Sequence, residues 1–274
     1  MNATSAKTSW KDLLPKVFTW LDSIEIEAGD TFSYDTHYVV PVERKELKDA
    51  SSITAEHLPQ DIKEKIPELL KIIGKEHLQS PTTITIKKTP ITLIPIINLN
   101  TSSSQKGRQV GLDAAKHLGK TQINQLGLGD TGNIGFLDIF DGMTQGLYQL
   151  NSFKSTNDKQ KLPEKIIVYS KNFTEEKLQD KIKFLQGTII SRMVADAPPN
   201  WLTSEKFAEI ARSISDDLGL KCTILDRKKM EEMNMGAFLS VAKGTPIEPN
   251  LIAIEIVGHN PKKWVSLVGK GLTF

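Results

Sequence analysis

The sequence predicts an α/β fold of two domains, and three observations predict it. Apolar runs typical of strands alternate with segments of helical spacing along most of the 274-residue chain, which is the order of elements in α/β proteins. Hydrophobic residues make up 39% of the chain and charged residues 25%, a mix typical of a folded, soluble protein. At roughly 100 to 200 residues per domain, the length favours two domains.

The elements expected before residue 175 follow from apolar spacing and from Gly and Pro signals. Asp61 begins a helix that Pro67 should kink or shorten and Gly74 should end. The continuous run ITLIPII predicts a strand buried on both faces. The complete set is a strand at 38–42, a helix from 61, strand material at 84–97, a helix at 107–118, a helical segment at 136–150, an exposed loop at 151–165 and a strand at 166–170.

A long amphipathic helix, which ends at Ala197 before Pro198 and Pro199, is expected to connect the two domains. Thr203 is the predicted N-cap of the next helix and Gly219 its stop. That helix should bury Phe207, Ile210, Ile214 and Leu218. The second domain then continues with a strand at 220–225, a helix at 227–233 capped by Asp226 and stopped by Gly236, and strands at 251–257 and 264–268.

Composition narrows the classes of function. The 35 Lys and Arg nearly balance the 33 Asp and Glu, so net charge gives no support for nucleic-acid binding. The single cysteine, Cys222, cannot form an internal disulfide, which favours a reducing compartment, and its apolar strand predicts an inert core residue. No apolar segment of a signal peptide follows the first basic residues, and no run is long enough to span a bilayer. We therefore expect a cytoplasmic protein without a membrane partner.

Two further patterns favour structural interpretations. The five histidines show no HExxH motif or ligand spacing, so each is interpreted as a surface or capping residue rather than a metal ligand: His37, His57, His77, His117 and His259. The segment GLGDTG, with Gly127, Gly129 and Gly132, matches the dinucleotide-binding pattern G-x-G-x-x-G. The preceding QINQL is a poor strand and no suitable acidic residue follows, so a flexible connection is favoured over a nucleotide site.

One lysine is a candidate for chemistry. The run from Val265 to Val268 reads as a buried strand that opens directly into Gly269, Lys270 and Gly271. Ligands of open α/β sheets bind outside the carboxyl ends of strands. From these residues alone, a solvated turn is still favoured over a ligand site.

Three longer segments change that interpretation: SRMVADAPPNWLTSEKFAE, MEEMNMGAFLSVAKGTPIEPNLIAIEI and WVSLVGKGLTF. In this order they resemble motifs of the leucyl aminopeptidase, or cytosol aminopeptidase, family of two-metal exopeptidases. The resemblance runs from about Lys181 to Phe274 and implies the start of a phosphorylase- or hydrolase-like α/β catalytic domain. The first 180 residues are similar, in pattern and length only, to the family's macrodomain-like amino-terminal α/β domain.

The resemblance implies that Lys270 is a metal ligand. An ammonium has no lone pair, so its pKa, ordinarily near 10.4, must fall until the free amine can bind. In the family the motif continues after Gly-Leu-Thr-Phe with Asp-Ser-Gly-Gly, whose aspartate is a ligand, and the catalytic side chains lie further on. No catalytic or cofactor-binding residue is therefore assigned within this chain. Asp196 and Ala197 also depart from the family's usual Asn and Thr.

We interpret the chain as the amino-terminal portion of a leucyl aminopeptidase, with a domain at 1–175, a linking helix at 176–197 and an incomplete catalytic domain at 198–274. By the resemblance, the parent enzyme uses two divalent ions, Mn or Zn, cleaves peptides with amino-terminal leucine and similar residues, and forms a homo-hexamer. The 274 residues alone are expected to be inactive. The alternatives are a macrodomain-like module that binds a nucleotide or nucleic acid, and a structural domain for hexamer assembly.

Overall fold

The computed structural model describes residues 11, 14–43, 53–74, 78–96, 100–119, 121–153 and 161–272. The chain divides into two compact units, one of Leu13–Ser191 and one of Met1–Asp12 with Arg192–Phe274. The division falls inside the long helix α5 (Glu175–Asp196), the element expected to connect the domains. The domain limits at 1–175, 176–197 and 198–274 stay predictions.

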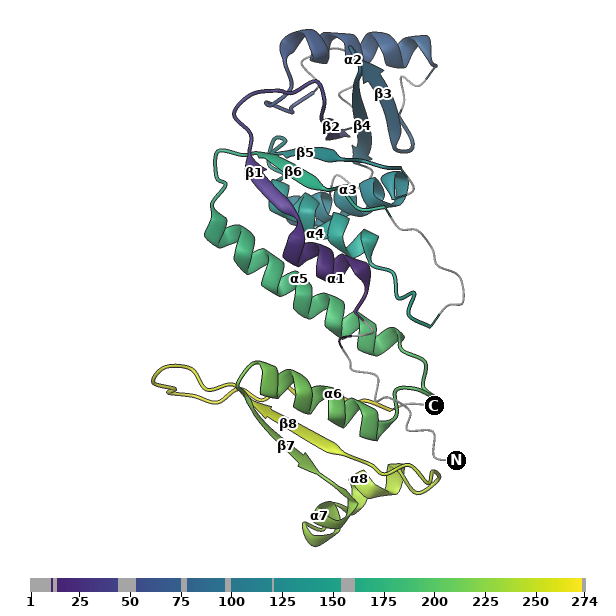
Figure 1. The fold of residues 1–274 in the computed structure, drawn as a ribbon, viewed down its shortest axis with the longest axis vertical. Helices are drawn as coiled ribbons and strands as arrows, with labels where there is room; N and C mark the ends of the chain where they lie inside the picture. The colour runs from purple at the N-terminus through teal and green to yellow at the C-terminus, as the bar shows by residue number, and fades with distance from the viewer. Residues whose placement is uncertain are drawn as a thin grey trace. The chain divides into compact units, whose positions relative to one another are not determined.

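Among the described residues, the first unit is built on a six-stranded sheet with the order β1-β6-β5-β2-β4-β3 (Figure 1). Neighbouring strands run parallel except β3 and β4, which are antiparallel. The strands are β1 (Glu25–Ala28), β2 (His37–Glu43), β3 (Thr82–Ile86), β4 (Thr89–Ile96), β5 (Gln125–Gly129) and β6 (Lys165–Tyr169). This mainly parallel sheet confirms the α/β class.

The strand material expected at 84–97 forms a hairpin. Lys87 and Lys88 connect β3 to β4 with φ angles of 50° and 74°, the left-handed conformation that tight hairpin turns require. Every residue of β4 except Pro90 is buried, so burial of the continuous apolar run is confirmed for residues 91–96, whereas Ile97 lies outside the described residues. On β3, Thr83 and Thr85 are exposed between buried neighbours, because a strand at the edge of a sheet covers the core with one face only.

Two hydrophobic clusters lie on opposite faces of this sheet. One joins apolar side chains of α1 (Lys16–Ser23), α3 (Ser103–Leu118), α4 (Phe136–Leu147) and α5 to the sheet. The other joins α2 (Gln60–Ile72) and residues 53–58 to it. Alternating strand residues serve the two clusters: Val39 belongs to the first, Tyr38 and Val40 to the second. Figure 1 shows α2 on one side of the sheet and the other helices of the first unit on the opposite side.

Helices α3 and α4 pack with their backbones almost in contact. A Cβ atom added to Gly142 of α4 would lie 1.9 Å from the backbone oxygen of Arg108, and one added to Gly111 of α3 would lie 1.9 Å from that of Ile139. Gly107 and Gly146 meet similar close neighbours on the opposite helix. These four glycines are spaced four residues apart on each helix, so they line one face of each.

Some expectations for the first unit are wrong. Helix α2 runs through Pro67 without being shortened, because Ile62 and Ile66 before the proline and Leu70 after it are all buried and hold both parts against the sheet. Gly74, with φ 65°, follows the helix as expected. Helix α1 and strand β1 were not predicted, since both are short, with eight and four residues.

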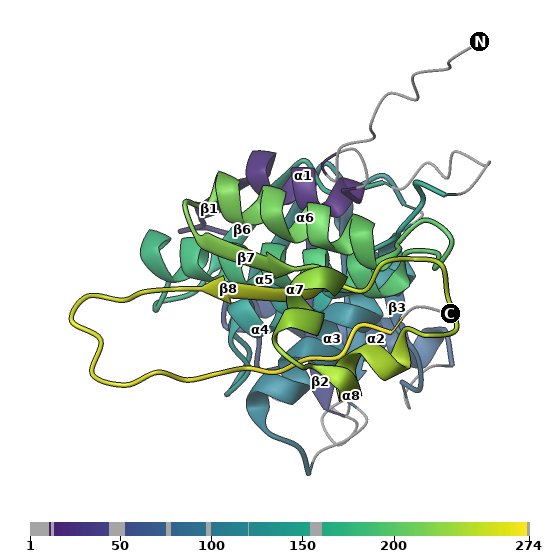
Figure 2. The same cartoon turned by 90° about the horizontal axis from the view of Figure 1, so that it is seen from below.

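The second unit consists of α6 (Ser204–Asp217), β7 (Lys221–Leu225), α7 (Arg227–Glu232), α8 (Gly236–Val241) and β8 (Leu251–Glu255). Strands β7 and β8 form an antiparallel pair, and α6 packs along them (Figure 2). Thr203 caps α6 by accepting a hydrogen bond from Lys206 N at 3.2 Å, and Gly219 follows it with φ 65°. Both signals are confirmed.

Three expectations for this unit are corrected. The stop after α7 is Asn234, with φ 55°, whereas Gly236 begins α8. On α6, Leu218 is exposed and the buried residues are Ala208, Ile210, Ala211 and Ser215, since only one side of this helix faces the two-stranded sheet. Cys222 is half-buried in β7 rather than a core residue. Among the described helices, none is long and apolar enough to cross a membrane.

Replacement of Gly142 by alanine should destabilise the first unit by at least about 1–3 kcal/mol, the usual cost of overpacking, because the new methyl group meets the backbone of α3. Gly187→Ala is the matched control: Gly187 lies in α5 with nothing within 4 Å of an added Cβ, so alanine should stabilise by up to about 1 kcal/mol. Urea unfolding of both variants measures this. Equal stability of Gly142→Ala and the wild type would contradict the packing.

Candidate functional site

Lys270 lies in a stretch without regular structure. Residues 261–272 form neither helix nor strand, and Leu267 and Val268 are both 95% exposed. The buried strand expected at 264–268 is therefore wrong for the described chain. A strand needs a neighbour to pair with its backbone, and in this part of the structure β7 and β8 pair only with each other.

The glycines beside Lys270 lie in open surroundings. Nothing lies within 4 Å of a Cβ added to Gly269, and one added to Gly271 would lie 3.5 Å from Cε1 of Phe207 on α6. The Phe207 ring thus places the end of the described segment next to α6. Lys270 itself is exposed.

The described residues do not form a metal site. They contain no group of three or more His, Cys, Asp and Glu side chains placed to hold an ion. One lysine amine is a single donor, whereas bound divalent ions take four or more ligands. The assignment of Lys270 as a ligand therefore stays a prediction.

Glu248 holds the loop after α8 in place. Its backbone oxygen accepts a hydrogen bond from Ser204 Oγ at the first turn of α6, and its carboxylate accepts one from Arg227 Nε at 3.0 Å. Ser204 and Glu248 belong to two of the three segments that carry the resemblance. Their contact brings these segments together in space.

The turn between α5 and α6 has the expected form. Helix α5 ends at Asp196, and the backbone N–H groups of Trp201 and Leu202 donate to the oxygen of Pro198 at 2.9 and 2.8 Å. Pro198 and Pro199 cannot donate backbone hydrogen bonds, which ends the preceding helix. The interpretation of this cluster as a helix stop and turn is confirmed.

The glycine-rich segment is not a flexible connection. Gln125–Gly129 is strand β5, between β6 and β2 in the sheet. A Cβ added to Gly127 would lie 2.5 Å from the Tyr38 ring, and one added to Gly129 would lie 2.2 Å from Nδ1 of His57. Because Gly127 and Gly129 have no side chains, the rings of Tyr38 and His57 fit against β5. The spacing of the glycines along the sequence does not reveal these contacts.

Side chains of the protein itself already lie over β5 and at the first turn of α4. The His57 ring stacks on Tyr169 at 5.2 Å and on Tyr38 at 5.7 Å between centroids. Asp130 Oδ1 accepts a hydrogen bond from Phe136 N at the first turn of α4. A carboxylate already lies where a bound phosphate would meet this helix, so the arrangement disfavours a dinucleotide there.

Two of the described histidines, His37 and His57, differ from their expected surface positions. His37 is buried in the sheet, where its Nε2 lies 2.7 Å from Thr92 Oγ1. Neither ring nitrogen of His57 has a hydrogen-bond partner among the described residues. His117 and His259 are exposed, and His77 lies outside the described residues. The aromatic partners of His57 come from distant strands, so local sequence carries no signal for them.

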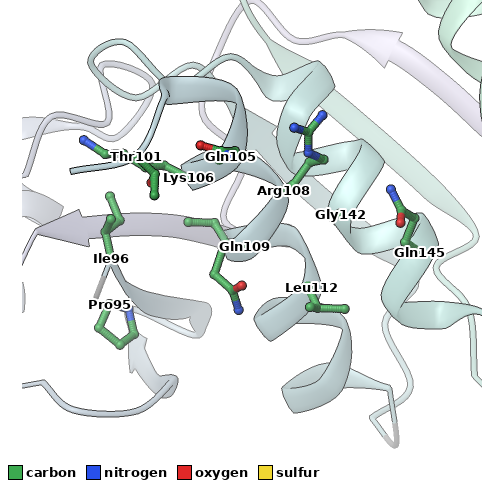
Figure 3. Close-up of a pocket in the computed structure, with 11 residues that line it drawn as sticks. Pro95, Ile96, Thr101, Gln105, Lys106, Arg108, Gln109, Leu112, Gly142 and Gln145 are labelled. Carbon is green, nitrogen blue, oxygen red and sulfur yellow. The ribbon is translucent and has the colours of Figure 1, made fainter. Parts of the chain in front are cut away.

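A hollow of about 330 Å³ lies beside the carboxyl end of β4 and along α3 (Figure 3). Lys106 and Arg108 give it positive charge, and no acidic side chain lines it. Figure 3 shows Arg108 and Gln109 leaving α3 in opposite directions, so they do not converge on a single point. The described residues that line the hollow include no carboxylate, imidazole or thiolate, so they offer none of the usual ligands of a hydrolase's metal ions.

Comparison with known proteins finds similarity to one peptidase family at the carboxyl-terminal end of the chain. Residues 189–274 match the family model described as "Cytosol aminopeptidase family, catalytic domain". A probable cytosol aminopeptidase of Prochlorococcus marinus (strain MIT 9312) is 35% identical over 129 residues, which are 46% of this chain and 26% of that protein. One from Alkaliphilus oremlandii (strain OhILAs) is 43% identical over 101 residues, 36% of this chain and 20% of that protein. The resemblance found in the sequence is confirmed.

The fold has a counterpart among solved structures. A mutant of tomato leucine aminopeptidase superposes with a TM-score of 0.69 at 23% sequence identity, over 84% of this chain and 50% of that one. At this identity the match concerns the fold. The matched part of the chain spans about a quarter of the length of the Prochlorococcus relative and half that of the tomato chain.

Acid should destabilise the first unit through His37, which is buried, and through His57, which is half-buried with both ring nitrogens shielded from solvent. Burial lowers the pKa of His37 to about 4, helped by the charge of His117. Burial also lowers the pKa of His57 to about 4, helped by Lys63 and opposed by Asp130. In the unfolded chain both titrate near 6.5, so between pH 6.5 and 4 only the unfolded state takes up these protons. Stability should fall by up to about 1.4 kcal/mol per pH unit for each histidine.

Urea unfolding between pH 7 and 4 measures this loss, and His57→Phe isolates one contribution. The phenylalanine keeps an aromatic ring but cannot be protonated, so its stability should depend less steeply on pH. His259→Gln, at an exposed position, is the control and should retain the wild-type dependence. The same pH dependence in His57→Phe and the wild type would show that His57 is not held neutral.

Proposed function

We propose that the protein is an aminopeptidase, a hydrolase that releases amino-terminal residues from peptides, because residues 189–274 match the model of the catalytic domain of the cytosol aminopeptidase family. The observation that carries the proposal is the family match over the second unit. The contact of Ser204 with Glu248 supports it, because it joins two of the matching segments.

The proposal includes two divalent metal ions, Mn or Zn, and Lys270 as one ligand. The described residues supply no further cluster of donors. We therefore propose that the remaining ligands come from family residues that follow the Gly-Leu-Thr-Phe motif and that the 274 residues alone do not form the site. Flanking glycines would let the backbone approach closely there. The ions, when bound, would polarise the peptide carbonyl and a water molecule.

Substrate, assembly and location follow as parts of the same proposal. Peptides with amino-terminal leucine and similar apolar residues are the proposed substrates, a homo-hexamer the proposed assembly and the cytoplasm the proposed location. The relatives named probable cytosol aminopeptidase support the last of these.

Nucleotide binding by the first unit gains no support. The side chains of Tyr38 and His57 fill the space over the glycine-rich strand, and Asp130 caps α4. Similarity to macrodomains stays a prediction from pattern and length.

The 274-residue chain alone should not hydrolyse leucine p-nitroanilide with added Mn²⁺ or Zn²⁺, because one lysine amine cannot hold the ions. A spectrophotometric assay of the purified chain, with the chelator EDTA as control, measures this. Hydrolysis that EDTA abolishes would show that the chain contains a complete site.

In the protein with the family's complete catalytic domain, both Lys270→Ala and Lys270→Arg should lower metal affinity about 10-fold or more, by analogy with the cost of disturbing metal-site partners. Arginine fails because its guanidinium stays protonated and has no lone pair for a metal. Isothermal titration with Zn²⁺ or Mn²⁺, together with leucine p-nitroanilide hydrolysis, measures both effects.

Lys263→Ala and Lys263→Arg are the matched controls, since Lys263 is exposed in the same irregular stretch. These variants should keep wild-type metal affinity and activity. If Lys270→Arg also keeps them, Lys270 is a solvated turn residue and its assignment is wrong, although the family assignment would stand.

A further inference from the structure

Four side chains form a continuous hydrogen-bonded chain from the surface of the first unit into its sheet. His37 Nε2 on β2 lies 2.7 Å from Thr92 Oγ1 on β4. Thr92 Oγ1 lies 2.8 Å from Thr83 Oγ1 on β3, which lies 3.0 Å from Nε2 of His117 on α3. His37 is buried and His117 is exposed, so the chain joins solvent to a buried imidazole.

Counting hydrogens restricts how this chain can be arranged. Three hydrogen bonds need three hydrogen atoms, and each threonine hydroxyl supplies one. The third hydrogen must therefore come from Nε2 of one histidine, while Nε2 of the other histidine accepts. When both rings are neutral, all three hydrogen bonds can be donated from His37 towards His117 or from His117 towards His37, provided that only one ring carries its proton on Nε2.

A proton on His117 removes this freedom. A charged imidazole carries hydrogen on both nitrogens, so His117 must donate to Thr83, Thr83 to Thr92 and Thr92 to His37. His37 Nε2 must then accept, and its ring hydrogen must be on Nδ1. If His37 also took up a proton, four hydrogens would compete for three positions and one hydrogen bond would break.

The surroundings leave this pair of rings as the responsive groups. The two side chains that link the histidines, one on β3 and one on β4, are neutral threonines. The β5 residue paired with His37 is Leu126. On α3, the charged residues within four positions of His117 are Lys116 and Asp113, and Asp113 Oδ2 accepts a hydrogen bond from Gln109 at 2.9 Å. Burial and the charge of His117 both lower the pKa of His37, to about 4. This agrees with a row of hydrogen bonds that accepts one extra proton and excludes a second.

We propose that His117, Thr83, Thr92 and His37 form a proton-sensitive relay, in which a proton on the exposed His117 fixes the tautomer of the buried His37 and excludes a second proton from it. The relay connects the last turn of α3 to three strands of the sheet. It thereby makes the hydrogen bonding of β2 respond to the pH of the solvent, and it is independent of the proposed peptidase function.

Nuclear magnetic resonance of the intact chain with ¹⁵N-labelled histidine tests the relay directly. The measurement is made above pH 5, where His37 is neutral, and at a pH at which the signals of His117 show it to be charged. His37 should then carry its hydrogen on Nδ1 and none on Nε2. A hydrogen on Nε2 of His37 under these conditions would overturn the proposal, and no variant is needed for this result.

Thr83→Val gives a second test, because valine keeps the β-branched shape and removes the hydroxyl. With the chain cut, a second proton no longer costs a hydrogen bond, so the pKa of His37 should rise by about 0.7 unit, the worth of one hydrogen bond. Thr85→Val, exposed on the same strand, should leave it unchanged. An unchanged or lowered pKa in Thr83→Val would contradict the relay, since an added methyl group alone would only increase desolvation.

Discussion

The close contact between α3 and α4 constrains the first unit more than any other interaction. Gly111 and Gly142 have no space for a Cβ atom, so the helices that follow β4 and β5 lie with their backbones together. This contact fixes how α3 and α4 together cover one face of the sheet. Gly127 and Gly129 play a similar part on the other face, where Tyr38 and His57 lie directly on β5. Close approach to glycine backbones thus organises both sides of the sheet.

The sequence predicted the regular elements where apolar spacing and cap signals agree. Helix α6 illustrates this, because Thr203 caps its start and Gly219 ends it. Prediction failed where long-range contacts decide the outcome. Helix α2 continues past Pro67 because its buried residues on both sides of the proline pack against the sheet. Strand β5 begins at Gln125, although the segment QINQL that leads into it has few features of a strand. Neither contact is visible in the local sequence.

At the candidate site, too, the local sequence predicted the resemblance but not the conformation, which depends on distant contacts. The motif around Lys270 indicated a resemblance to the cytosol aminopeptidase family, and the match of residues 189–274 to that family's model confirmed the resemblance. Its local conformation was predicted wrongly: Val265 to Val268 form no strand among the described residues, and Lys270 is exposed. Whether these residues pair as a strand depends on contacts with other segments, and the local sequence does not signal those contacts.

The most direct test of the account is hydrolysis of a leucine-initiated peptide by the protein with the family's complete catalytic domain, with and without an acetyl group on the amino terminus. An aminopeptidase needs the free amine, so the account predicts stepwise release of amino-terminal residues from the free peptide and no cleavage of the acetylated one. Mass spectrometry of the products distinguishes the cases. Equal cleavage of both peptides, or cleavage of neither with Mn²⁺ or Zn²⁺ present, would contradict the account.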